Sequence, residues 1–96
     1  MITSKQRSYL RTISNELQPI FQVGKAGIEE NFIKQVEDAL ESREIIKIKV
    51  LNNSGLTARE ALDIICDATG AEGIQAIGSK CVVYKRSLKK PKIELP

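Results

Sequence analysis

The residues with the clearest chemical potential form a single G-x-x-G turn, made of Gly24, Lys25, Ala26 and Gly27. The turn lies between the apolar run 20–23 and an amphipathic segment that starts at Ile28, an order that predicts strand, turn and helix. Two glycines three residues apart allow the backbone to turn sharply and to lie flat against a partner. The following helix would add unpaired N–H groups and the positive end of its dipole. Such a turn suits the phosphates of a nucleic-acid backbone.

The motif alone has two interpretations. Used against a sugar-phosphate backbone, a G-x-x-G loop is the clamp of the KH class of RNA-binding modules, which would make this loop KH-like. Glycine pairs before helices are also common structural turns, so the rest of the chain must decide between the two. A nucleotide-binding P-loop is disfavoured, because Lys25 is followed by Ala26 and Gly27 and not by Ser or Thr.

A basic flank on the first predicted helix, residues 4–17, provides further candidates. Arg7 and Arg11 lie one helical turn apart, and Lys5 precedes them. Together with Lys25 they would neutralise three or four phosphates of a bound RNA. The alternative is a solvated helix face with no ligand.

The charges are unevenly spread along the chain, although the net charge is only +3. Residues 1–27 carry four cations against one carboxylate, and residues 79–96 carry six against one. The segments 28–44 and 57–78 together carry ten carboxylates against three cations. This distribution predicts a two-sided molecule whose basic side suits a polyanion. A charge mixture that serves only solubility is the alternative.

The periodicity and turn signals predict one α/β domain over residues 1–96, with the element order α-β-α-β-α-β-β. Strand–helix–strand units favour parallel crossovers and the final hairpin adds an antiparallel pair, so we expect a mixed four-stranded sheet in a two-layer, α+β-like arrangement. The tail 88–96 is predicted to be extended or mobile. The expected helices cover 4–17, 28–42 and the segment from the Thr57–Glu60 capping box to Gly70, and the expected strands cover 20–23, 45–51, 73–77 and 80–85.

The chain lacks the residues that several functional classes of protein need. The chain has no His, and Cys66 and Cys81 have no partner for nucleophilic activation or metal spacing, so no catalytic residue, metal or cofactor is predicted. Four aromatic residues are too few for a base-stacking mode of RNA recognition. There is no apolar run near 18 residues and no signal peptide, so we expect a cytoplasmic protein without a membrane partner or a small-molecule substrate.

Six segments of the chain form a recognisable set in order and spacing, and they are 3–7, 23–28, 39–47, 68–71, 82–86 and 90–96. Taken together, these segments resemble those of bacterial YhbY-type proteins, which are stand-alone CRM (chloroplast RNA splicing and ribosome maturation) domains. The resemblance implies a fold similar to the C-terminal domain of bacterial initiation factor three, RNA binding through the G-x-x-G loop, and association with precursors of the large ribosomal subunit. Two positions depart from the family pattern, Ala26 where Gly or Asn is frequent and Arg43 where His is frequent.

The leading hypothesis is a non-catalytic RNA-binding protein that acts on large-subunit precursor RNA through the loop, with Lys5, Arg7 and Arg11 extending the contact. The alternatives are a binder of intron or messenger RNA and a protein–protein adaptor that acts through the acidic helix 28–42. The sequence leaves open the exact RNA site, the assembly step and the oligomeric state. It also leaves open RNA contacts by Lys47, Lys49, Tyr84 and Arg86.

Overall fold

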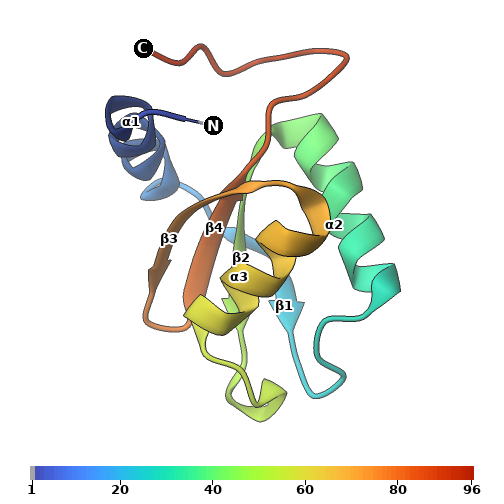
Figure 1. Ribbon diagram of the computed structural model, residues 1–96. Helices are drawn as coiled ribbons and strands as arrows, with labels where there is room; N and C mark the ends of the chain where they lie inside the picture. Colours follow the sequence, from blue (N-terminus) through green and yellow to red (C-terminus); the bar gives the residue numbers. More distant parts are fainter. Residues whose placement is uncertain (1) are drawn as a thin grey trace.

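A four-stranded mixed sheet in the order β1-β2-β4-β3 forms the centre of the computed structural model, which describes residues 2–96 (Figure 1). Strands β1 and β2 are parallel, and β4 pairs antiparallel with both β2 and β3. The mixed α/β fold and the element order expected from the sequence are confirmed. The elements are α1 (Ser4–Ser14), β1 (Pro19–Val23), α2 (Glu30–Arg43), β2 (Ile45–Val50), a short 3-10 helix η1 (Asn52–Ser54), α3 (Ala58–Thr69), β3 (Glu72–Ile77) and β4 (Lys80–Tyr84).

Helices α2 and α3 cover one face of the sheet. Their apolar stripes, with Val36 and Leu40 on α2 and Leu62 and Ile65 on α3, pack against alternate residues of the strands. Near the end of α3, Ala68 is exposed and Thr69 is buried, and the Thr69 hydroxyl donates to the Ile65 carbonyl and accepts from the Ala71 N–H. This face holds the larger core of the molecule.

Helix α1 and the C-terminal tail cover part of the opposite face. Leu10 of α1 packs on Ile45, Ile74, Val82 and Tyr84, and Ile93 and Leu95 of the tail close the cluster. The expected two layers are therefore extended by a third, partial layer over one half of the sheet (Figure 1). This third layer needs apolar side chains on both faces of β4, and the run Cys81–Tyr84 is buried throughout.

The helix ends follow their local sequence signals, with two differences. Both predicted capping boxes form, Thr3 with Gln6 and Thr57 with Glu60, and Gly70 ends α3 in the left-handed conformation. Helix α1 ends at Ser14 and not at residue 17, because the chain must reverse before Pro19 to enter β1. Helix α2 begins two residues later than expected, at Glu30, although Ile28 still packs on the core.

The tail after β4 has no regular secondary structure, but two carboxylates of α2 hold its backbone. Glu44, which is fully buried, accepts hydrogen bonds from the N–H groups of Ser87, Lys92 and Ile93 at 2.6–2.8 Å. Glu41 accepts from the Ser87 hydroxyl and from the N–H groups of Leu88 and Lys89. We call this arrangement the carboxylate clasp. That the tail is extended or mobile stays a prediction.

Glu44 occupies a strained position that the clasp offsets. Its φ of +67° is left-handed, which side chains other than glycine rarely adopt. Burial acts to raise the pKa of the Glu44 carboxyl, but the backbone N–H groups of Ser87, Ile93 and Lys92 stabilise the ionised form more, so the pKa lies below its ordinary value. Hydrogen bonds from Ser87, Leu88 and Lys89 likewise lower the pKa of Glu41. The clasp therefore stabilises the fold in its ionised state.

The clasp makes stability sensitive to acid. Because the folded pKa of Glu44 is depressed, its contribution is complete above the ordinary carboxyl pKa of about 4.3 and is lost as the pH falls through the lower folded value. At pH 7, Glu44→Gln should lower the free energy of unfolding by about 2 kcal/mol, because buried N–H groups lose a charged acceptor. Below pH 4.3 the difference from the wild type should shrink. Urea unfolding between pH 3 and 7 measures the loss of unfolding free energy at neutral pH and its decrease in acid.

Glu37→Gln changes an exposed position of α2 and is the matched control, so its free energy of unfolding should change little. A difference that stays constant over this range would contradict the clasp.

Candidate nucleic-acid interface

The G-x-x-G segment forms a closed turn at the end of β1. The Gly27 N–H donates to the Gly24 carbonyl at 2.9 Å, and Gly27 has a φ of +75°. Glu44 is the only residue other than glycine with positive φ between residues 2 and 96, so Ala26 lies outside the left-handed region. The departure from the family pattern at Ala26 therefore puts no strain on this turn.

Gly24 and Gly27 serve the turn differently. Gly27 is required by its backbone conformation, since a side chain there would be strained. A Cβ at Gly24 would meet only the side chains of Leu51 at 3.7 Å and Asn53 at 4.0 Å, which is ordinary contact. The fold therefore does not require glycine at position 24. The absence of a side chain at Gly24 therefore has no packing reason in this fold.

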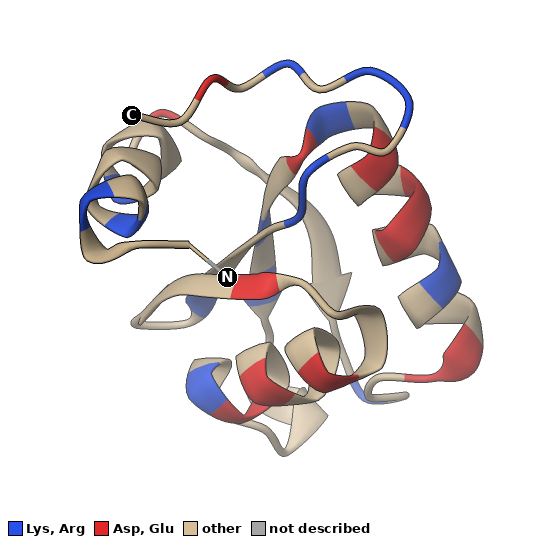
Figure 2. Cartoon of the chain, turned by 45° about the horizontal axis from the view of Figure 1, so that its top comes forward, with Lys and Arg blue, Asp and Glu red and all other residues tan. Residues whose placement is uncertain are grey.

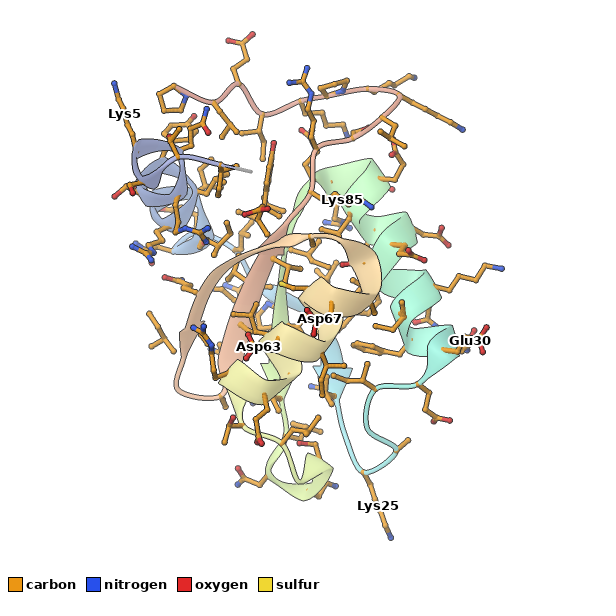
Figure 3. The ribbon with its side chains drawn as sticks, in the orientation of Figure 1. Lys5, Lys25, Glu30, Asp63, Asp67 and Lys85 are labelled. Carbon is orange, nitrogen blue, oxygen red and sulfur yellow. The ribbon has the colours of Figure 1, made fainter. Side chains whose placement is uncertain are left out.

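Behind the turn, the N-terminus of α2 is uncapped. Glu29 is the N-cap residue, and its side chain makes no capping hydrogen bond. The turn and about the first two turns of α2 line an open depression, and the residues that carry the first N–H groups of the helix are part of this lining. The exposed carboxylates of Glu29 and Glu30 border it, so the depression is not uniformly basic. Lys25 projects from the tip of the turn into solvent, away from Glu30 (Figure 3).

The α1 cations lie at the other end of the molecule. Figure 3 shows Lys5 and Lys25 pointing outward from opposite ends of a body 38 Å long. Arg7 donates to the Gly73 carbonyl and pairs with Glu72 at 3.5 Å, and Arg11 donates through Nε to the Ile74 carbonyl at 3.2 Å. The structure therefore keeps the predicted site residues in two groups, the loop and the α1 flank. Only a ligand that spans the molecule would touch both.

Arg7 and Arg11 have a structural role that the sequence did not indicate. Strand β3 is an edge strand, and both arginines bond to carbonyls of its backbone. Unpaired carbonyls on an edge strand are a site for unwanted pairing with another chain, and arginine side chains cover them. Arg11 remains exposed to solvent, whereas Arg7 is half-buried.

The sequence left open whether Tyr84 and Arg86 contact RNA, and the structure shows where both residues lie. Tyr84 is buried under α1 and the tail, so its ring is not available for stacking on a base. Arg86 is exposed at the start of the tail. The neighbouring Lys85 donates to the Thr69 carbonyl at the end of α3. Figure 2 shows the cations mainly on α1, β2 and the tail, and the carboxylates mainly along α2 and α3.

The nucleophilic and metal-binding chemistry of the described residues is limited. Burial, followed by the charge of Asp63, raises the pKa of the Cys66 thiol to about 11. Burial raises that of Cys81 to about 12, so both remain protonated near neutral pH. Residues 2–96 contain no group of three or more potential metal ligands. No helix within this range is long and apolar enough to span a bilayer.

The fold is that of a small mixed α/β protein with an exposed G-x-x-G turn at the end of β1. Residues 2–85 match the CRS1 / YhbY (CRM) domain, and the chain belongs to this family.

Named relatives agree with this assignment. The chain is 42% identical to the "Probable RNA-binding protein YqeI" of Bacillus subtilis, and the match covers 100% of both chains. It is 32% identical to an "RNA-binding protein" of Haemophilus influenzae over 99% of this chain and 95% of that protein. The solution structure of SAV1595 from Staphylococcus aureus superimposes with a TM-score of 0.78 at 43% identity, over 100% of both chains.

The role of Arg7 at the β3 edge can be measured directly. Arg7→Ala should lower the free energy of unfolding by about 1–2 kcal/mol, because the Gly73 carbonyl loses a charged donor and Glu72 loses its partner. Lys5→Ala removes an exposed cation from the same helix and should change stability by less than about 0.5 kcal/mol. Urea unfolding at pH 7 gives both values. Equal stability of the two variants would mean that the arginine contributes nothing to the strand edge.

Proposed function

We propose that this chain is a non-catalytic RNA-binding protein that acts in the cytoplasm on precursors of the large ribosomal subunit. The observation that carries the proposal is the turn Gly24–Gly27. The fold does not need glycine at position 24, and the turn presents Lys25 beside the N-terminus of α2, which has no side-chain cap. A phosphate lying against this turn would accept hydrogen bonds from N–H groups and would meet a cation.

The α1 flank would extend the contact on a large RNA. Lys5 and Arg11 are exposed, and both lie on α1. Because the loop and α1 lie at opposite ends, an RNA that engages both must be folded or long. Recognition would then depend on the shape and backbone of structured RNA, which agrees with the buried position of Tyr84.

The choice of ribosomal RNA rests on the family. The relatives named above are RNA-binding proteins, and YhbY-type domains are associated with large-subunit precursors. A few phosphate contacts give only modest affinity at cellular salt, so binding would be reversible. Reversible binding suits a factor that leaves when the subunit is mature.

The loop can be tested without disturbing the fold. Replacing Lys25 and Ala26 together by Asp, with both glycines kept, should abolish binding to an in vitro transcript of large-subunit ribosomal RNA, because two carboxylates would repel phosphate. Wild-type binding should show a slope of log K against log salt of about −2 to −4, as expected for three or four phosphate contacts. Arg11→Ala should make the slope shallower by roughly one unit, since one phosphate contact is lost. Fluorescence anisotropy at several salt concentrations measures the RNA affinity and its salt slope.

A matched control separates loop chemistry from net charge. Arg59→Asp and Ala68→Asp together introduce the same charge change on the exposed surface of α3, away from the loop depression. This control should bind RNA more tightly than the loop variant. Wild-type affinity in the loop variant, with a normal melting curve, would remove the loop from the mechanism.

The cellular role predicts a distribution between ribosomal particles. In a density gradient, the native protein should co-sediment with immature large subunits and be absent from mature ribosomes. An even spread through mature ribosomes and polysomes, or absence from all ribosomal fractions, would contradict the assembly role. If one of these two distributions is found and the purified protein still binds RNA, the partner is better sought among messenger or intron RNAs. If the purified protein does not bind RNA, the result favours an adaptor that acts through the acidic face of α2.

A further inference from the structure

A row of four side chains crosses the part of the sheet that α1 leaves uncovered. The strand register places Gln22 beside Lys49, Lys49 opposite Lys80, and Lys80 opposite Ile77, so one residue comes from each strand. The faces follow from alternation, because Phe21, Ile48 and Cys81, the neighbours of these residues, pack on the α2 and α3 side. We call these four residues the transverse row. At the usual separation of strands it spans about 14 Å.

The two lysines of the row form a like-charge pair that the fold does not compensate. Directly opposite residues on one face have Cβ atoms about 5 Å apart, and like charges there are destabilising. Lys47 adds a third cation on the same face of β2. Between residues 2 and 96, no carboxylate lies within 4.0 Å of these ammonium groups. The only acidic residue in the four strands is Glu72, which pairs with Arg7 at the far end of the sheet.

The position of Lys49 and Lys80 does not match the protective role that lysines have at the edges of β-sheets. Lysines on edge strands prevent sheets from pairing with one another, but β2 and β4 are the two central strands. Lys49 is half-exposed and Lys80 is exposed, so both can reach a ligand above the sheet. Ile77, which is 67% exposed, adds an apolar contact at the end of the row.

The row begins at the loop. Gln22 lies two residues before Gly24 and lines the same depression as the turn. The Leu51 N–H donates to the Val23 carbonyl at 2.9 Å and the Val50 N–H donates to the Ser79 carbonyl at 2.6 Å, which holds the ends of β1, β2 and the β3–β4 hairpin together. The turn and the near end of the row are therefore neighbours at the edge strand β1, and a chain of phosphates bound at the turn would pass around this edge at Gln22 to reach Lys49 and Lys80.

We propose that the transverse row is a second RNA-binding surface, in which Lys49 and Lys80 bind consecutive phosphates of the strand held at the G-x-x-G turn. The proposal rests on the proposed function and assigns this end of the molecule, rather than the α1 flank, as the main continuation of the loop site. Bound phosphates would relieve the repulsion between the two lysines. Phosphate binding would thus explain why the fold keeps two opposed lysines without a counter-charge.

The test is the double variant Lys49→Gln and Lys80→Gln. Its affinity for an in vitro transcript of large-subunit ribosomal RNA should fall about five- to tenfold at 0.1 M salt, and the salt slope should become shallower by about 1.5 units, because two phosphate contacts are lost. The melting temperature should stay the same or rise, since the like-charge pair is removed. An unrelated structured RNA of equal length should lose affinity to the same extent, because phosphate contacts do not read sequence.

Two further variants keep the result specific. Lys89→Gln with Lys90→Gln removes the same charge from exposed positions in the tail, and it should change the affinity less than twofold. Lys49→Glu alone places opposite charges across β2 and β4. It should fold at least as stably as the wild type and should bind RNA more weakly than the double Gln variant.

The outcomes separate this proposal from the one on which it rests. If the wild type binds RNA and the loop variant does not, but the Lys49/Lys80 variant keeps full affinity and slope, only the transverse row is overturned. The same result is expected if the pair binds an acidic protein segment instead of RNA. Equal losses in the row variant and the tail control would also overturn the row as a site. A wild type without salt-dependent RNA binding would overturn both proposals.

Discussion

The buried carboxylate of Glu44 connects most parts of this fold. Its backbone lies where α2 meets β2, its carbonyl accepts from the Lys85 N–H at the end of β4, and its side chain accepts three N–H groups of the tail. A buried charge is tolerated only when it is hydrogen-bonded on all sides, and here the backbone of the tail supplies those bonds. The tail is thereby directed over the sheet, where Ile93 and Leu95 complete the cluster around Leu10.

The two faces of the sheet have different tasks. The α2 and α3 face is fully apolar and supplies most of the core, while the helices turn their carboxylates outward. The α1 face is apolar where α1 and the tail lie on it, and beyond them it carries Lys47, Lys49 and Lys80 together with exposed Ile77. A polyanion approaching from the acidic side would be repelled, so the charge pattern orients it toward the loop and the uncovered strands.

Several groups near the loop do little for the stability of the fold. Gly24 has room for a side chain, the first turn of α2 lacks a side-chain cap, and Lys49 lies opposite Lys80 without a counter-charge. By contrast, the cations of α1 that looked most like phosphate ligands already have partners, since Arg7 and Arg11 bond to the edge of β3. Unused donors and charges thus gather at the loop end of the molecule.

The sequence by itself determined the order and type of the elements and the place of the turn. Periodicity, capping boxes and glycine ends are local signals, so α2, α3 and the final hairpin were predictable to within two residues at most ends. The α/β class and the family also followed from motifs along the chain.

Only the tertiary structure decided which cations are free and which face of the sheet is open. Arg7 and Gly73, or Lys49 and Lys80, are far apart in sequence, and their proximity depends on strand order and register, which local patterns do not encode. The clasp around Glu44 was invisible for the same reason, because its donors come from a tail without periodicity. Contacts between distant segments therefore separate the structural charges from those available to a ligand.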